Sequence, residues 1–137
     1  MKIPYQKNYQ WQEPEILALE LNKEWGEDGL VFLDGDGTKL GNTIIIGLNP
    51  IAEIHARGLP NQSQSTNPFK LLKDLPPGNW TGWLSYEAGA WLEPNDYWKD
   101  DAISTLWMAS YDPIIRFDLQ TQKLSIEGYS RNQLSKY

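Results

Sequence analysis

The sequence predicts an α+β fold that is largely antiparallel β-sheet, sandwich-like, with two to three helices. Three observations support this prediction. Apolar and β-branched runs recur along the chain and are bounded by Gly, Pro, Asn or Asp, which is typical of strands joined by turns. Helical signals are confined to a few short segments. In a parallel sheet the strands would alternate regularly with helices, and no such alternation is found here.

The composition narrows the class of protein further. A length of 137 residues predicts a single domain, residues 1–137, which is large enough to bury a hydrophobic core. The net charge is -6 and the Lys and Arg residues are scattered, so a nucleic-acid groove has no electrostatic basis. The absence of cysteine excludes disulfides and thiolate metal sites. Because no apolar run is long enough to span a bilayer and the first residues lack a signal-peptide core, we expect a cytoplasmic protein.

A helix is expected over residues 13–25. Pro14 is well placed in a first helical turn, the acidic residues on either side of it suit the helix dipole, and Gly26 ends the helix. Helical periodicity gives this segment one apolar face, which we expect to be buried: Leu17, Ala18, Leu21 and Trp25.

Three consecutive strands are expected next, over residues 30–33, 43–48 and 51–57, and we expect them to pair antiparallel in that order. In the third strand apolar and polar residues alternate. Its apolar side consists of Ala52, Ile54 and Ala56, and its polar side of Glu53, His55 and Arg57. His55 is the only histidine of the chain, and we expect it on the surface.

The second half of the chain predicts one more helix and further strands. Asn67 is a good helix N-cap and Pro68 a good first helical residue, and the pair Pro76-Pro77 closes this helix. The expected strands span residues 80–87, 105–111, 114–118 and 123–129. They are connected by a short helical or irregular turn over 88–92, an exposed loop over 95–102 and a turn over 120–122.

Tryptophan is frequent in this half of the chain. A strand over residues 80–87 would hold Trp83 and Tyr86 on opposite faces. We expect the Trp residues at positions 80, 83, 91, 98 and 107 to lie in the core or in an interface. An apolar face that bears Trp and stays open would indicate a missing partner.

The segment VFLDGDGT, residues 31–38, resembles the catalytic strand end of aspartate-nucleophile phosphatases. There Asp34 would be the nucleophile and Asp36 the general acid and base, with Mg²⁺ between them and the phosphate. The remaining acidic and basic groups of such a site do not follow on successive parallel strands, since the candidate group 99–101 lies in a loop. A calcium loop lacks its required glycine and glutamate in either register. We therefore favour a turn between antiparallel strands, in which Asp-Gly and Gly-Asn pairs supply positive φ angles.

Five short blocks follow one another over most of the chain, from Leu30 to Gly128. They are FLDG (32–35), IIIGLNPIAEI (44–54), NPFKLL (67–72), GWLSYE (82–87) and YDPIIRFD (111–118). No block is specific by itself, but the series resembles the N-terminal domain of the chorismate-utilising synthases. These are component I of anthranilate synthase and of aminodeoxychorismate (para-aminobenzoate) synthase.

The resemblance implies an α+β domain that packs against a C-terminal chorismate-binding domain. In this family that second domain holds Mg²⁺ and chorismate, and a glutamine amidotransferase subunit delivers the ammonia. The 137 residues do not include it, so we expect this chain to carry no catalytic residue, no metal site and no cofactor. Its expected role is structural, with a regulatory role as a further option, and alone it should be inactive.

The resemblance also implies an amino-acid pocket after the first strand of this family. There a short segment helps to bind tryptophan, as a feedback inhibitor in anthranilate synthases and as a structural ligand in some aminodeoxychorismate synthases. It reads Leu-Leu-Glu-Ser in the anthranilate type, and here the candidate residues are Leu33, Asp34 and Gly35. Asp34 keeps a carboxylate that can face an ammonium group, whereas Gly35 removes the hydroxyl. The Gly-Arg-aromatic-Ser lead of the anthranilate type is replaced by residues 41–44, GNTI. We therefore expect the aminodeoxychorismate branch, in folate biosynthesis, with the anthranilate branch of tryptophan biosynthesis as the alternative.

Overall fold

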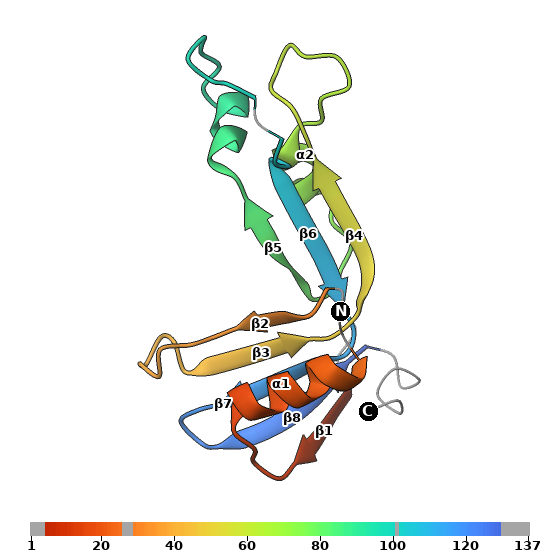
Figure 1. Ribbon diagram of the computed structural model, residues 1–137, viewed down its shortest axis with the longest axis vertical. Coiled ribbons are helices and arrows are strands. Elements are labelled where there is room, and N and C mark those ends of the chain that lie inside the picture. The colour runs from red at the N-terminus through yellow and green to blue at the C-terminus, as the bar shows by residue number, and fades with distance from the viewer. Residues whose placement is uncertain (1–4, 26–28, 101, 130–137) are drawn as a thin grey trace. The chain divides into compact units, whose positions relative to one another are not determined.

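The computed structural model describes residues 5–25, 29–100 and 102–129. This part of the chain has an α+β fold with a five-stranded sheet, a three-stranded sheet and three short helices, and the strand pairs given below are antiparallel (Figure 1). The chain divides into two compact units, Met1–Ile51 with Tyr111–Tyr137, and Ala52–Ser110. The α+β class and the antiparallel sheets agree with the sequence prediction, while the expectation of one domain over residues 1–137 stays a prediction.

The first unit is built on the five-stranded sheet, in which the strand order is β1-β8-β7-β3-β2. Each neighbouring pair in this order is antiparallel. One helix, α1 (Pro14–Trp25), belongs to this unit and has the bounds that its proline and its apolar periodicity predict. The strands are β1 (Tyr5–Tyr9), β2 (Val31–Leu33), β3 (Thr43–Gly47), β7 (Ile114–Asp118) and β8 (Lys123–Gly128).

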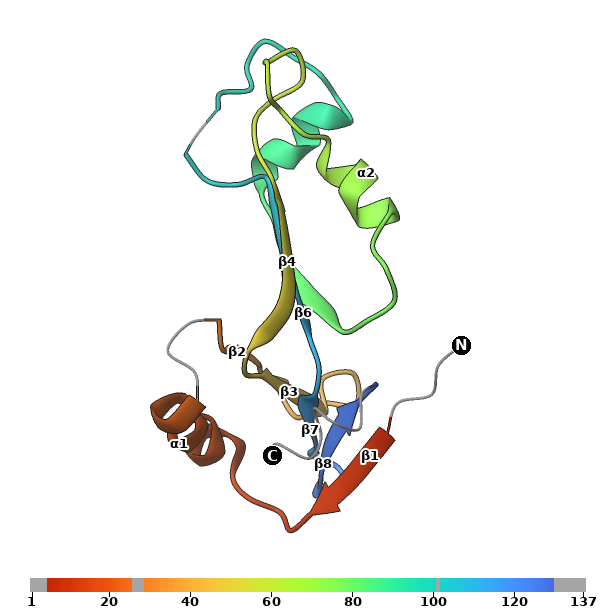
Figure 2. The ribbon, with the colours of Figure 1, turned by 90° about the vertical axis from the view of Figure 1, so that its right-hand side faces the viewer.

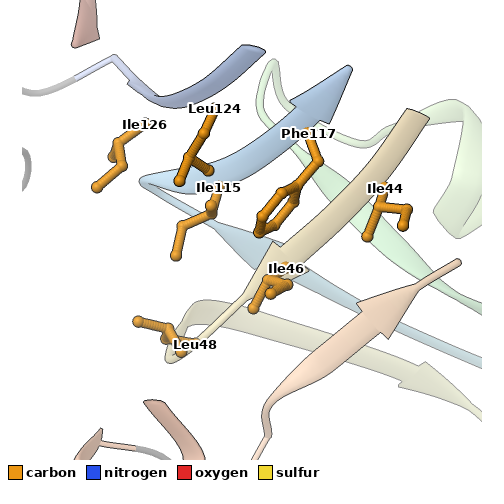
Figure 3. Packing of buried hydrophobic residues seen from close by; sticks show 7 residues of the cluster. All are labelled: Ile44, Ile46, Leu48, Ile115, Phe117, Leu124 and Ile126. Carbon is orange, nitrogen blue, oxygen red and sulfur yellow. The ribbon is translucent and has the colours of Figure 1, made fainter. Parts of the chain in front are cut away.

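The core of the first unit lies on one face of this sheet (Figure 3). Cross-strand register places Ile46, Ile115 and Ile126 in one row, and a second row contains Phe117 and its neighbours on β3 and β8. Each fully buried aliphatic or aromatic side chain contributes about 1.5–3 kcal/mol. The core cluster consists of Ile44, Ile46, Leu48, Ile115, Phe117, Leu124 and Ile126.

Helix α1 packs its apolar face against this core. Leu17, Ala18 and Leu21 contact the cluster, as the sequence predicts. The side chain of Trp25, which was expected on the same face, lies outside the described residues. Just before the helix, the ring of Trp11 meets Phe117 edge-on, with 5.8 Å between the ring centroids and an interplanar angle of 90°. Such an edge-to-face geometry is a favoured arrangement of two aromatic rings.

Tyr111 is the largest of the fully buried side chains, with 1 % of its surface exposed. Its ring lies against Gly47 of β3, where a Cβ would come within 2.5 Å of Cδ1. Its hydroxyl donates a hydrogen bond to the carbonyl oxygen of Gly29, just before β2. The absence of a side chain at position 47 is therefore what lets this tyrosine fill the space beside β3.

The second unit contains the three-stranded sheet, in which β6 lies between β4 and β5. Figure 2 shows α2 and η1 on the same side of this sheet. Asn67 caps α2 as predicted, because its side-chain oxygen accepts a hydrogen bond of 3.0 Å from the backbone N–H of Phe69. The elements are β4 (Pro50–Ala56), α2 (Pro68–Lys73), β5 (Trp80–Leu84), the 3₁₀-helix η1 (Tyr86–Trp91) and β6 (Leu106–Tyr111).

Three expectations about the strands are corrected. Strand β4 pairs with β6 and not with β3, so the strands of the first half are not all consecutive partners. Strand β5 ends at Leu84, and Tyr86 begins η1 instead of continuing the strand opposite Trp83. Strand β1 was not expected, because its sequence YQKNY has no apolar alternation; in the structure all its residues are exposed. It forms because β8 offers a free edge for five register pairs.

Burial along β4 follows the predicted alternation, with one exception. Ile54 is half-buried and Ala56 buried, whereas Glu53, His55 and Arg57 are exposed. His55 is thus a surface residue, as expected. Ala52, on the apolar side, is exposed. The tryptophans of the second unit are not core residues: Trp83 is 42 % exposed and the other four are half-buried.

We predict that Gly47→Ala destabilises the protein by about 1–3 kcal/mol, because the new methyl group overlaps the ring of Tyr111. Urea unfolding followed by circular dichroism measures the change. In a Tyr111→Leu background the same substitution should cost clearly less, since the smaller side chain leaves room. Equal costs in both backgrounds would contradict the assignment of the obstacle to this ring.

Candidate functional site

The segment VFLDGDGT connects two antiparallel strands. Strand β2 ends at Leu33, and β3 returns beside it with Val31 opposite Gly47 and Leu33 opposite Ile45. The chain between them, residues 34–42, has no helix or strand. The structure therefore confirms the interpretation of this segment as a connection between antiparallel strands.

Asp36 organises this connection. Its Oδ1 accepts hydrogen bonds from the backbone N–H of Thr38, at 2.9 Å, and from the Thr38 hydroxyl, at 2.6 Å. The turn is closed by backbone bonds between Gly37 and Gly41, at 2.9 Å, and between Gly41 and Thr38, at 3.1 Å. The Thr38 hydroxyl, and secondly the Thr38 backbone N–H, hold the pKa of the Asp36 carboxyl below its ordinary value. The carboxylate thus serves the turn.

The glycines of the segment have different roles. Only Gly37 has a positive φ, of 79°, which agrees with the turn chemistry that the sequence predicts. Gly35 is needed for a different reason: a Cβ there would run into the backbone carbonyl oxygens of Gly41 and Thr43. A Cβ on Gly41 would overlap the Asp36 carboxylate. The predicted positive φ angles are thus wrong for Gly35, where backbone carbonyls take up the space, and for Gly41, where the Asp36 carboxylate does.

The three residues of the expected amino-acid pocket lie at the end of β2. Leu33 is 42 % exposed and points to the sheet face opposite the core, because its register partner is Ile45. Asp34 is exposed, and Gly35 is half-buried. They lie together because they are consecutive in the chain. Their role in ligand binding stays a prediction.

Polar residues on the same sheet face as Leu33 were not singled out from the sequence. Arg116 stands opposite Ile45 in the register, and its Nε donates a hydrogen bond of 3.1 Å to Glu127 Oε2. Ser125, 5 % exposed, donates a hydrogen bond of 3.5 Å to the other oxygen of Glu127. Arg116, Ser125 and Glu127 alternate with apolar residues in their strands. This sequence pattern could have predicted that they share one face of the sheet.

Two cavities lie near this segment. One, of about 400 Å³, is lined by residues of the turn and of the β7–β8 connection: Gly37, Thr38, Lys39, Asn42, Leu119 and Gln120. The other is an apolar groove of about 450 Å³ between α1 and β2, lined by Glu15, Ala18, Leu19, Asn22, Leu30 and Phe32. The candidate residues Leu33, Asp34 and Gly35 line neither of them.

Over residues 5–25, 29–100 and 102–129, no three His, Cys, Asp or Glu side chains gather closely enough to hold a metal ion. No described helix combines the length and the apolar character that crossing a membrane requires.

We predict that the carboxyl of Asp36 titrates below 3.8 in the folded protein. Because this pKa is lowered on folding, the group adds stability above its unfolded pKa, and that contribution is lost as the pH falls through the folded pKa. Carboxyl carbon shifts in an NMR titration measure it, and Thr38→Val should raise it toward 3.8.

Asp118 provides the control for this titration. Its pKa is lowered mainly by the backbone N–H of Thr121, in the turn after β7, and should not respond to Thr38→Val. A Thr38→Val protein in which the Asp36 pKa stays unchanged would contradict the assigned cause.

We further predict that Gly35→Ser destabilises the protein by about 1–3 kcal/mol, because the added Cβ meets two backbone carbonyl oxygens that cannot rotate away. Asp34→Ser, a change to the same residue type at the exposed neighbouring position, should stay within about 0.5 kcal/mol of the natural protein. Thermal unfolding of both variants makes the comparison. Equal stability of the two variants would argue against crowding at Gly35.

No protein-family model matches this chain, and no curated protein matches it.

Proposed function

We propose that this chain is the non-catalytic N-terminal domain of a chorismate-utilising synthase, component I of the aminodeoxychorismate type. The observation that carries the proposal is the placement of the five sequence blocks on the fold. They fall in order on β2, on β3 with β4, on α2, on β5 with η1, and on β6 with β7. An ordered series of five blocks over most of the chain is a stronger argument than any single block.

The blocks also supply much of the buried core. Ile44 and Ile46 come from the second block, and Ile115 and Phe117 from the fifth; all four are at most 5 % exposed. Core residues are constrained by packing, so likeness at such positions concerns the fold. The finer assignment, to the sandwich-like N-terminal domain of these synthases, rests on this likeness and on the α+β class.

The geometry of the DGDGT turn favours this proposal over a phosphatase. An aspartate-nucleophile site presents its two carboxylates at the end of a parallel strand, facing the phosphate. Here β2 and β3 are antiparallel, and the Asp36 carboxylate accepts two hydrogen bonds from Thr38. A general acid and base needs a carboxyl that is free to exchange its proton with a substrate.

The crowding at Gly35 favours the aminodeoxychorismate branch over the anthranilate branch. The anthranilate-type segment has serine where this chain has Gly35. A side chain there would overlap the carbonyl oxygens of Gly41 and Thr43, so this turn requires glycine at position 35. Asp34 has a carboxylate, like the glutamate of the anthranilate-type segment, and it is exposed. This residue is what still supports the anthranilate alternative.

In this proposal the chain contributes no reacting group. It packs against a chorismate-binding domain, which supplies Mg²⁺ and the residues that act on chorismate, and a glutamine amidotransferase subunit supplies ammonia. The contribution of the N-terminal domain is to stabilise its partner.

We predict that this chain alone neither consumes chorismate nor releases phosphate from a phosphomonoester. Joined at its C-terminal end to the chorismate-binding domain of an aminodeoxychorismate synthase, it should support conversion of chorismate with ammonium and Mg²⁺. Loss of the chorismate absorbance and chromatography of the product measure this conversion. The same chorismate-binding domain without the chain, prepared in parallel, is the control.

A folded joined protein that is no more active than the control would contradict the proposal. Mg²⁺-dependent phosphate release that Asp34→Asn abolishes would instead support the phosphatase. Titration with tryptophan in a calorimeter tests the amino-acid pocket at Leu33, Asp34 and Gly35 separately, because saturable heat would show that it binds a ligand in either branch of the family.

A further inference from the structure

Three aromatic rings are in contact at the surface of the second unit, one pair of them stacked and the other tilted. The ring centroids of Tyr97 and Trp98 are 5.0 Å apart with 29° between the planes, and those of Tyr86 and Trp98 are 5.2 Å apart with 46°. Tyr86 begins η1, and the other two rings lie in the chain that follows this helix. We call these three residues the aromatic stack.

The outer rings of the aromatic stack face solvent. Tyr86 is 79 % exposed and Tyr97 58 %, whereas Trp98 between them is half-buried. Because the rings already touch, no side chain can insert between them. A ligand would therefore contact the outer faces of the two tyrosines. These three rings do not form a groove in which a proline could bind between two separated rings.

Local hydrogen bonds hold the aromatic stack in place. The indole N–H of Trp98 donates to the carbonyl oxygen of Glu93 at 2.9 Å, and the backbone N–H of Tyr97 donates to Asn95 Oδ1 at 3.2 Å. The Trp98 ring also lies over Gly89, where a Cβ would be 3.0 Å from Cη2. A ligand would thus find these rings already ordered, which lowers the entropic cost of binding.

The segment that carries the aromatic stack is rich in acidic residues. Residues 86–100 contain four acidic side chains and one basic, Lys99, and the whole chain carries a net charge of -6. Among the described residues, neither Glu93 nor Asp96 forms an ion pair, and both are exposed. Asp96 and Trp98 line one cavity of about 260 Å³, together with Leu59, Pro60, Asn61, Gln62, Ala90, Pro94 and Asn95.

Exposed aromatic faces in a segment with unpaired carboxylates are complementary to a cation. The negative face of an aromatic ring attracts Lys and Arg, and a planar guanidinium can stack on the ring while it donates hydrogen bonds to a carboxylate. An ammonium group satisfies the charge but has no plane to stack. Both properties of this surface therefore fit arginine better than lysine.

We propose that the aromatic stack and Asp96 form a binding site for an arginine side chain in a basic, extended segment of a partner protein. The guanidinium stacks on an outer tyrosine ring, and Asp96, which precedes Tyr97 in the chain and lines the cavity beside Trp98, neutralises it. This site lies in the second unit and is independent of the synthase proposal.

The test is an NMR titration of the full chain with the peptide Gly-Arg-Gly-Arg-Gly, observed at the Trp98 indole N–H and the tyrosine rings. The matched probe is the same peptide with citrulline, which keeps the size and plane of arginine but has no charge. We expect saturable shifts with a Kd on the order of 1 mM for the arginine peptide. The citrulline peptide should bind at least about fivefold more weakly, and high salt should weaken the arginine peptide.

Variants connect the binding to the named residues. Tyr97→Ala and Asp96→Asn should each weaken binding about threefold or more, while Trp83→Ala, which removes an exposed ring of the three-stranded sheet, should not. Tyr97 and Asp96 are exposed, so these variants are expected to fold, and the tryptophan indole signals check this directly.

Three results would overturn the proposal. The first is equal binding of the citrulline peptide, which would leave no role for charge. The second is unchanged binding in both Tyr97→Ala and Asp96→Asn. The third is a neutral disaccharide, cellobiose, that binds the same rings more tightly than the arginine peptide, since the amide side chains of the cavity would then be the specific contacts.

Discussion

The pairing of β3 with β7 is the interaction on which the five-stranded sheet depends. It joins Thr43–Gly47 to Ile114–Asp118, segments roughly 70 residues apart in sequence, so its formation must offset the entropy of closing a long loop. The offset comes from apolar burial, because Ile46 stands opposite Ile115 in this ladder and both are buried. Strand β8 and then β1 add to the outer edge of β7. The sheet and its core therefore form together.

The same pairing explains why the second unit is an insertion. Residues 52–110 leave the first unit after β3 and return just before β7, and they build their own three-stranded sheet. In this unit α2 and η1 provide short helical cover, and the tryptophans are distributed over half-exposed positions. The tryptophans of this unit thus lie nearer to its surface than to its core.

Turn chemistry accounts for the segment that most resembles an active site. A carboxylate two residues before a threonine can accept both the N–H and the hydroxyl of that threonine, and Asp36 does so with Thr38. The flanking glycines then leave room for the backbone carbonyls beside Gly35 and for the Asp36 carboxylate beside Gly41. The letters of a phosphatase motif and of a tight reversal coincide here because both need small residues and short acidic side chains. The antiparallel partner β3 distinguishes the two.

The sequence by itself determined the features that depend on neighbours in the chain: the α+β class, the cap of α2, the bounds of α1 and of β7, and the turn at Asp36. Only the tertiary structure decided strand partners, the edge strand β1, the crowding at Gly35 and the ion pair between Arg116 and Glu127. The reason is physical. Caps and periodicity are set by hydrogen bonds and faces within a few residues, whereas register, crowding and cross-strand pairs come from segments that meet only when the sheet closes.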